Sequence, residues 1–317
     1  MAVFTPVAEA DVLELLQAFD PQARLLGLEG IGDGIENTNY FAHVQLQGQP
    51  QTLVLTLFET LQSEQVEEFA QIMRWWSAQG FPVPAPLFDP ASHLPQQLSG
   101  KPALLLPRLP GRHALTPSPA HCQQLGALLA RMHLVAPQAP FPRPVERSLP
   151  WMRQQQHRLR GLLPVESEQR LAQAIDHYEA CLPLLSACVQ GLVHGDLFRD
   201  NVLFEGQAIS GLIDFYHSGW EVLLFDLAVV ANDWCQGPNY RLDPLRLEAL
   251  LKGYREIRTF SPSEAKAWPQ LLRLAALRFW LARLTSRYLP SYQQRSTQGD
   301  ATKAPEEMEQ LLIQLPQ

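Results

Sequence analysis

A segment near residue 200 combines three polar side chains with short apolar runs, and it constrains the fold more than any other part of the chain. It runs Leu-Val-His-Gly-Asp-Leu-Phe-Arg-Asp-Asn from Leu192 to Asn201, and a later apolar run ends at Asp214. The apolar runs are typical of short buried strands, which would hold the polar side chains around one cleft. Phosphoryl transfer needs one carboxylate that deprotonates a hydroxyl group, and an amide oxygen and a second carboxylate that hold Mg²⁺. The segment therefore predicts Asp196 as the catalytic base, with Asn201 and Asp214 as ligands of Mg²⁺.

The spacing of this motif decides between a kinase centre and a chance arrangement of turn-forming residues. A His-x-Asp pair alone has little value, whereas Asp-x4-Asn followed by Ile-Asp-Phe is far more specific. The pattern resembles the catalytic and metal-binding loops of the aminoglycoside phosphotransferase superfamily, the protein-kinase-like small-molecule kinases. In that superfamily the loop has His-Gly-Asp where protein kinases have His-Arg-Asp, and here it is His194-Gly-Asp196. The resemblance implies an α+β, bilobal protein-kinase-like fold.

Size and composition exclude several other classes of protein. The chain has 317 residues, of which 46% are hydrophobic and 18% charged, as in globular proteins. Its net charge of −7 argues against nucleic acid or an anionic membrane as the main partner. We expect a cytoplasmic protein, because the N-terminus shows no signal peptide and the longest apolar run, 222–231, is too short to span a bilayer. The four cysteines have neither metal-ligand nor disulfide spacing.

Hydrophobic periodicity predicts a small β-rich lobe at 1–108 and a larger, mostly helical lobe at 109–317. A proline-rich break at 107–112 marks the connection between them. A turn at Gly48-Gln49-Pro50 would join the first two strands as a hairpin. In the first lobe we expect helices at 9–19 and 63–79 and strands at 38–46, 52–58 and 103–106. In the second lobe we expect helices at 118–133, 151–163, 166–189 and 302–315, and helices that open at Asp243-Pro244 and Ser261-Pro262. Pro269 should kink or reset the helix that opens at Ser261.

A glycine-rich segment at 30–40 is the candidate for phosphate contacts. It contains Gly32 and Gly34, followed by Asn37 and Asn39, and leads into the first hairpin strand. Glycines allow the backbone to approach phosphate closely, and backbone N–H groups can line it. A P-loop is excluded, because the residues that follow the glycines are not the Lys and the Ser or Thr that a P-loop requires. The segment matches a lid over ATP, as in protein kinases.

The strand before the lobe connection is the candidate for adenine contacts. Leu106 would form part of the adenine wall. Pro107 has no N–H group, so the hydrogen-bond donor to adenine would be the N–H of Arg108 or Leu109. Kinases place a lysine on the third strand for the phosphates, but the corresponding residue here is Thr56, which carries no charge.

The resemblance narrows to one branch of the superfamily, the bacterial homoserine kinases. The matching segments include 34–41, 53–59 with Thr56 in place of lysine, and Asn-Asp-Trp-Cys at 232–235. The resemblance implies an enzyme that uses ATP and Mg²⁺ to phosphorylate homoserine, a step that leads to threonine. The chain departs from the pattern in two places: Gly195 stands where that family usually has alanine, and 217–221 is His-Ser-Gly-Trp-Glu.

An amino-acid acceptor needs a cation for its carboxylate and hydrogen-bond acceptors for its ammonium group. Arg199 and Arg112 are candidate cations, while Asn37, His217 and Glu221 are candidates for the ammonium side. For each of them a surface charge or a capping contact is an equally good interpretation. We further expect Asp226 to bond the backbone of the catalytic loop, and His194 to hold the loop by hydrogen bonds.

Two alternatives remain open from the sequence. The first is a kinase of the same fold that acts on choline, an aminoglycoside or protein Ser/Thr, and Trp220 with Glu221 keeps a choline cage open. The second is a nucleotide-binding pseudokinase, which Thr56 motivates. The intact Asp196, Asn201 and Asp214 argue against the pseudokinase.

Overall fold

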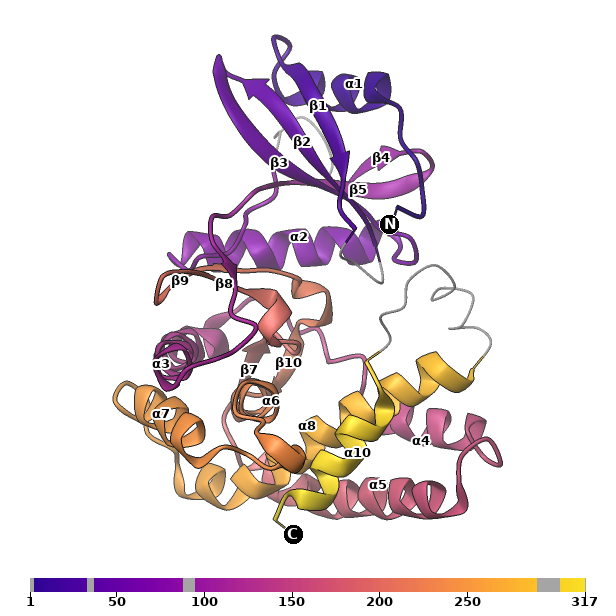
Figure 1. Ribbon diagram of the computed structural model, residues 1–317, viewed down its shortest axis with the longest axis vertical. Coiled ribbons are helices and arrows are strands. Elements are labelled where there is room, and N and C mark those ends of the chain that lie inside the picture. Colours follow the sequence, from indigo (N-terminus) through magenta and orange to yellow (C-terminus); the bar gives the residue numbers. More distant parts are fainter. Residues whose placement is uncertain (1–2, 33–36, 88–94, 290–302, 317) are drawn as a thin grey trace. The chain divides into compact units, whose positions relative to one another are not determined.

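The computed structural model describes residues 3–32, 37–87, 95–289 and 303–316 (Figure 1). The chain divides into two compact units; the first ends at Pro110, and the second begins at Gly111 and includes 303–316. The first unit is built on an antiparallel sheet and the second is mostly helical, so the predicted α+β class is confirmed.

A five-stranded antiparallel sheet, in the order β1-β2-β3-β5-β4, forms the first unit (Figure 1). Helix α1 packs against β1 and β4 and buries Val12 and Leu16 against Leu53, Leu55 and Leu105 of the sheet. This apolar core is what holds the strands rigid. The elements of the unit are α1 (Glu9–Phe19), β1 (Arg24–Gly30), β2 (Thr38–Leu46), β3 (Gln49–Leu57), α2 (Ser63–Ala78), β4 (Gln96–Leu98) and β5 (Lys101–Pro107).

The hairpin turn between β2 and β3 lies one residue earlier than predicted. Leu46 pairs with Gln49, so the turn consists of Gln47 and Gly48 alone, and Pro50 belongs to β3. Gln47 has φ 50° and Gly48 has φ 75°. Two consecutive residues with positive φ match the twist of the flanking strands, and glycine at the second position makes this turn favourable.

The second unit is mostly helical. It also contains three short antiparallel strand pairings, which lie in the connections between helices. Helix α3 packs on α7, and α5, α6 and α10 pack on α8 (Figure 1). Two glycines let α3 and α7 approach closely, since an added Cβ would lie 2.1 Å from the Leu250 carbonyl oxygen at Gly126 and 2.1 Å from the Gln123 carbonyl oxygen at Gly253. The helices are α3 (Pro119–Val135), α4 (Leu149–Arg158), α5 (Val165–Ser186), α6 (Leu224–Trp234), α7 (Pro244–Arg255), α8 (Pro262–Tyr288) and α10 (Pro305–Gln314). The strands are β6 (Arg112–His113), β7 (Gln190–Val193), β8 (Val202–Glu205), β9 (Ala208–Leu212) and β10 (Gly219–Val222).

Helix α8 does not restart at Pro269, so of the two effects predicted for this proline, a kink or a reset, the reset is wrong. The helix is one element from Pro262 to Tyr288, with Pro269 inside it. Proline removes one backbone hydrogen bond, but the turns that follow bury Leu271, Trp280 and Leu281 completely. Tertiary packing of this apolar face outweighs the local cost of the proline.

Helix α8 begins with a capping box, which agrees with the Ser-Pro-Ser-Glu sequence at 261–264. The Ser261 hydroxyl accepts from the Glu264 N–H at 3.2 Å, and the Glu264 carboxylate accepts from the Ser261 N–H at 2.8 Å. We expect Ser261→Ala to lower the free energy of unfolding by about 1 kcal/mol, measured by urea denaturation. Ser263→Ala is the control, because the Ser263 side chain makes no hydrogen bond to the described residues. Equal losses in both variants would contradict the capping role.

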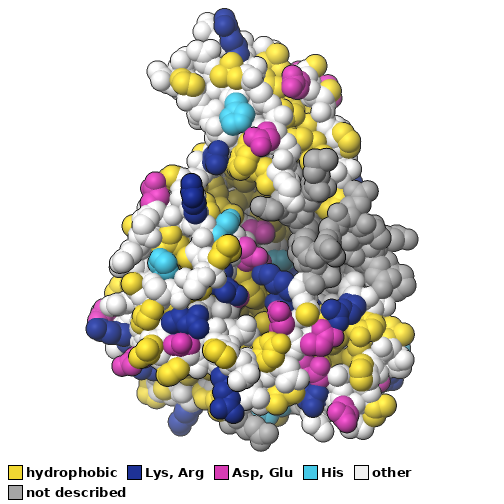
Figure 2. Space-filling view, in the orientation of Figure 1, with side chains coloured by type: hydrophobic (Ala, Val, Ile, Leu, Met, Phe, Trp, Pro, Cys, Tyr) yellow, Lys and Arg dark blue, Asp and Glu magenta, His cyan; other side chains and the backbone are white. Residues whose placement is uncertain are grey.

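Charge on the visible face is mixed. Figure 2 shows Lys and Arg side chains intermingled with Asp and Glu over the second unit. No helix in the described part of the chain is long and apolar enough to cross a membrane.

Candidate active site

Asp226 fixes the backbone of the loop that follows β7. The N–H groups of His194 and Gly195 each donate to its carboxylate at 2.7 Å. Asp226 lies in the first turn of α6 and is 1% exposed, so these bonds are shielded from water. The predicted structural role of Asp226 is therefore confirmed, and the loop that presents Asp196 is rigid.

His194 links this loop to the loop after β9. Its Nδ1 accepts from the Asp196 N–H at 3.2 Å, so its Nε2 carries the hydrogen and donates to the Ile213 carbonyl oxygen at 3.0 Å. Burial lowers the pKa of His194, which favours this neutral tautomer. The prediction that His194 holds the loop by hydrogen bonds is confirmed.

Two residues of these loops have positive φ. Gly195 has φ 84°, and a Cβ added there would lie 2.6 Å from the His217 carbonyl oxygen, so only glycine fits without a shift of the backbone. Asp214 has φ 67° and ψ 60°, a left-handed conformation that costs a non-glycine residue free energy. Such strain is typical of functional loops. The chain departs from the homoserine kinase pattern at Gly195 and at 217–221. These two places contact each other through Gly195 and His217.

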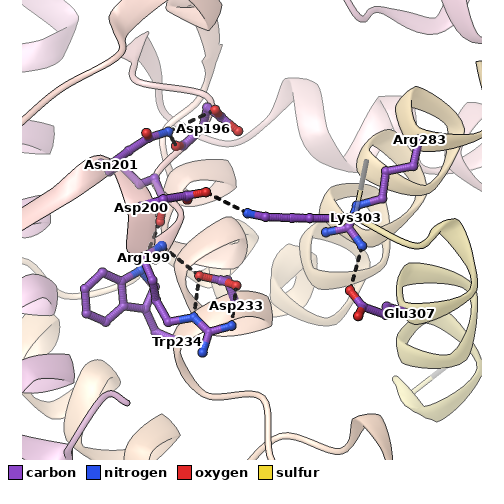
Figure 3. Close-up of polar contacts among 10 residues, drawn as sticks. Asp196, Arg199, Asp200, Asn201, Asp233, Trp234, Arg283, Lys303 and Glu307 are labelled. Atoms are coloured by element: carbon purple, nitrogen blue, oxygen red, sulfur yellow. Dashed lines mark hydrogen bonds and ion pairs between the residues drawn. The ribbon is translucent and has the colours of Figure 1, made fainter. Parts of the chain in front are cut away.

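Asn201 is bonded to Asp196 and lies next to Asp214 along the β8–β9 pairing. Its Nδ2 donates to the Asp196 carbonyl oxygen at 2.7 Å and to Asp196 Oδ2 at 3.0 Å (Figure 3). The Ile213 N–H donates to the Asn201 carbonyl oxygen at 3.0 Å, which brings Asp214 alongside. Because the amide nitrogen is engaged by Asp196, the amide oxygen is the atom of Asn201 that a cation can bind. This donor set fits Mg²⁺, which prefers oxygen ligands.

Arg199 is held by an ion pair within the second unit. Its Nε donates to Asp233 Oδ2 at 3.1 Å and its Nη2 donates to Asp233 Oδ1 at 3.2 Å (Figure 3). Its Nη1 donates to the Leu115 carbonyl oxygen at 3.1 Å. The Arg199 N–H also donates to Asp233, at 2.8 Å. The charge of this candidate cation is therefore matched by Asp233. Arg112, the other candidate cation, is exposed on β6 opposite Phe204.

The two candidates from the 217–221 segment have different surroundings. Glu221 accepts from Arg278 Nη2 at 2.7 Å, and Arg278 is almost completely buried, so the carboxylate balances a buried charge. His217 lines a small pocket of the second unit together with Gly195. Burial, and then the charge of Arg147, hold the pKa of His217 well below its usual value. His217 is therefore neutral at neutral pH.

The candidate nucleotide contacts of the first unit lie on β2, β3, β5 and the segments that follow β1 and β5. Thr56 is buried and donates to Asn39 Oδ1 at 2.8 Å, across a pairing of β2 with β3. Gly32 and Asn37 lie on the segment between β1 and β2, whereas Gly34 falls outside the described residues.

The structure distinguishes between the two candidate donors to adenine. The Arg108 N–H donates to the Thr52 carbonyl oxygen at 3.2 Å, while the Leu109 N–H makes no hydrogen bond within 3–32, 37–87, 95–289 and 303–316. Leu106 is buried on β5 opposite Val54. Of the two candidates, Leu109 is therefore the one whose N–H group can still serve adenine.

Several residues that support the site were missed by reasoning from the sequence. Asp233 anchors Arg199, and Trp234 Nε1 donates to the Leu197 carbonyl oxygen at 3.1 Å. Both residues belong to the Asn-Asp-Trp-Cys segment, which supported the resemblance but carried no assigned role. In the first unit Glu59 accepts from Thr38 at 2.7 Å and pairs with Lys101 at 3.3 Å. These partners are distant in sequence, so no local spacing indicates them.

Comparisons with known proteins give matches over most of the chain. The phosphotransferase enzyme family matches residues 27–260. The homoserine kinase of Pseudomonas aeruginosa is 41% identical over 286 residues, which cover 90% of this chain and 88% of that protein. The homoserine kinase of Cupriavidus necator is 39% identical over 298 residues, which cover 92% and 90%. A solved structure of spectinomycin phosphotransferase with ADP and spectinomycin has a TM-score of 0.63 at 16% identity and covers 97% of this chain and 100% of that one, a likeness of fold.

Proposed function

Because the chain belongs to the phosphotransferase enzyme family, we propose that it is a cytoplasmic homoserine kinase. It would transfer the γ-phosphoryl group of ATP to the side-chain hydroxyl of L-homoserine, a step on the route to threonine. The homoserine kinases compared above, at 41% and 39% identity over about nine tenths of the chain, support the choice of acceptor. The hydrogen bond between Asn201 and Asp196, in a loop clamped by Asp226, is the structural observation that supports the chemistry.

In this proposal Asp196 is the catalytic base. It orients the acceptor hydroxyl and takes its proton as the oxygen attacks the γ-phosphorus. Asn201 and Asp214 would bind Mg²⁺, which neutralises charge on the phosphates. Asn201 has a second role, because its Nδ2 holds the Asp196 carboxylate in one orientation while the hydroxyl approaches.

The first unit would bind ATP through its glycine-rich segment and the end of β5. No lysine stands on β3, so the phosphate charge would be offset by Mg²⁺ and backbone N–H groups. Thr56 and Asn39 fix each other by a hydrogen bond and would present one polar surface toward the nucleotide. The proposed nucleotide contacts are Gly32, Gly34, Asn37, Asn39, Thr56, Leu106, Arg108 and Leu109. Of the last two, Leu109 would donate its N–H to adenine, because the N–H of Arg108 is bonded to the Thr52 carbonyl oxygen.

The choline alternative has less support than the amino-acid acceptor. A quaternary ammonium group needs an aromatic and acidic cage. Trp220 and Glu221 would form this cage together. The Glu221 carboxylate, however, already pairs with Arg278 at 2.7 Å. Arg199, Arg112, His217 and Glu221 remain predictions for acceptor contacts.

The test is ADP release with Mg-ATP across L-homoserine, L-serine, L-threonine, choline and spectinomycin. We expect kcat/KM for L-homoserine to exceed that for L-serine by a factor of about 10 to 200, because L-serine lacks one methylene group. Chelation of Mg²⁺ with EDTA should abolish turnover. Turnover with choline or spectinomycin alone would overturn the acceptor, and ATP binding without turnover of any acceptor would favour a pseudokinase.

A further inference from the structure

A small pocket of the second unit lies beside the catalytic loop. Its volume is about 20 Å³, and Gly195, the residue before Asp196, forms part of its wall. A space of this size holds one or two water molecules or a group such as a carboxylate, and it is too small for a sugar ring. Its other polar and charged lining residues are Arg143, Glu146, Arg147, His217 and Arg278.

The charges around this pocket do not balance. Arg143 pairs with Glu146 at 2.5 Å, and Arg278 pairs with Glu221 at 2.7 Å. Arg147 makes no ion pair with any residue that the structure describes. One guanidinium charge at the pocket is therefore unmatched, which favours an anionic ligand.

His217 adds hydrogen-bonding capacity without adding charge. It is neutral at neutral pH, because burial and the neighbouring charge of Arg147 lower its pKa. Its ring makes no hydrogen bond to residues in the described ranges. A neutral imidazole has one N–H donor, which can serve a carboxylate oxygen next to Arg147.

The backbone ties this pocket to the catalytic loop. The His217 carbonyl oxygen lies 2.6 Å from the position that a Cβ of residue 195 would occupy. Glycine at 195 therefore lets the 215–217 turn pack directly on the loop that carries Asp196. The pocket wall at Gly195 and the residue Asp196 therefore belong to the same loop.

We propose that this pocket binds the carboxylate of the acceptor, with Arg147 as its charge partner and His217 as a hydrogen-bond donor. The inference rests on the proposed function, because it requires an amino-acid acceptor. In L-homoserine a short carbon chain separates the carboxylate from the hydroxyl group, so binding at the pocket leaves the hydroxyl close to Asp196. Guanidinium is suited to this role because it binds a carboxylate through two parallel hydrogen bonds.

The first test is Arg147→Gln. We expect kcat/KM for L-homoserine to fall by a factor of about 10 to 100, mainly through KM, because a hydrogen-bonded charge partner is lost. The KM for ATP should not change, and Arg147→Lys should recover part of the loss. Arg131→Gln on the exposed face of α3 is the matched control and should behave as the wild type.

The second test uses 3-amino-1-propanol, which is homoserine without its carboxylate. The wild type and Arg147→Gln should phosphorylate it with equal kcat/KM, and thermal melts should show that both are folded. A wild-type KM for L-homoserine in Arg147→Gln, or equal losses with both acceptors, would overturn the inference. Failure of the proposed function is distinguished from these outcomes, because the wild type itself would then not phosphorylate L-homoserine. That result would overturn the inference as well.

Discussion

Asp196→Asn is expected to lower kcat by a factor of about 10² to 10⁴ and to leave ATP binding near that of the wild type. The substitution keeps the size of the side chain but removes the group that takes the proton of the acceptor hydroxyl. Asparagine keeps one side-chain oxygen, which can still accept from Asn201 Nδ2 as Asp196 Oδ2 does at 3.0 Å, so the orientation of Asn201 is preserved. A coupled assay of ADP release gives kcat, and titration calorimetry gives the Kd for ATP.

Asp200→Asn is the matched control, since it makes the same chemical change four residues away in the same loop. Asp200 pairs with Lys303 at 2.8 Å, and both side chains are about half exposed (Figure 3). Exposed ion pairs of this kind contribute about 0 to 1 kcal/mol, so kcat should stay near the wild-type value. Near-normal turnover of Asp196→Asn, or an equal loss in Asp200→Asn, would remove the role assigned to Asp196.

Much of the candidate site could be predicted from the sequence because its key relations are local. Asp196 and Asn201 are five residues apart, and the β8–β9 pairing that brings Asp214 next to Asn201 joins adjacent segments. The role of Asp226 was also predicted, although its partners His194 and Gly195 lie 32 and 31 residues earlier in the chain. A carboxylate inside an apolar run must find donors, and the nearest are the backbone N–H groups of a buried loop.

Other features could not be predicted because they depend on contacts between distant segments. Asp233 pairs with Arg199, and Arg147 meets His217, only after the helices have packed. Strand β1 was missed because it is a largely exposed edge strand with a bulge between Leu25 and Gly27, which breaks the alternation of apolar and polar residues. The continuity of α8 through Pro269 likewise depends on packing rather than local propensity.

Asp226→Asn is expected to lower the free energy of unfolding by about 3 kcal/mol and to reduce kcat strongly. Two backbone N–H groups donate to the two oxygens of Asp226, at 2.7 Å each, in a site that is 1% exposed. An amide has only one oxygen, so its NH₂ group would face one of these N–H donors, and water cannot reach the site to compensate. Urea denaturation measures the loss of stability, and the ADP assay measures the effect on turnover.

Asp243→Asn separates this effect from the general consequences of replacing Asp by Asn. Asp243 caps α7, where one of its oxygens accepts from the Arg246 N–H at 3.0 Å, and asparagine caps a helix about as well as aspartate. We therefore expect the free energy of unfolding of Asp243→Asn to lie within a few tenths of a kcal/mol of the wild-type value. If Asp226→Asn is equally mild, the two hydrogen bonds to His194 and Gly195 do not determine the position of the catalytic loop. A large loss of stability in Asp226→Asn alone would mean that the Asp226 carboxylate holds the catalytic loop in place. Only a carboxylate presents two acceptor oxygens to the two buried N–H donors.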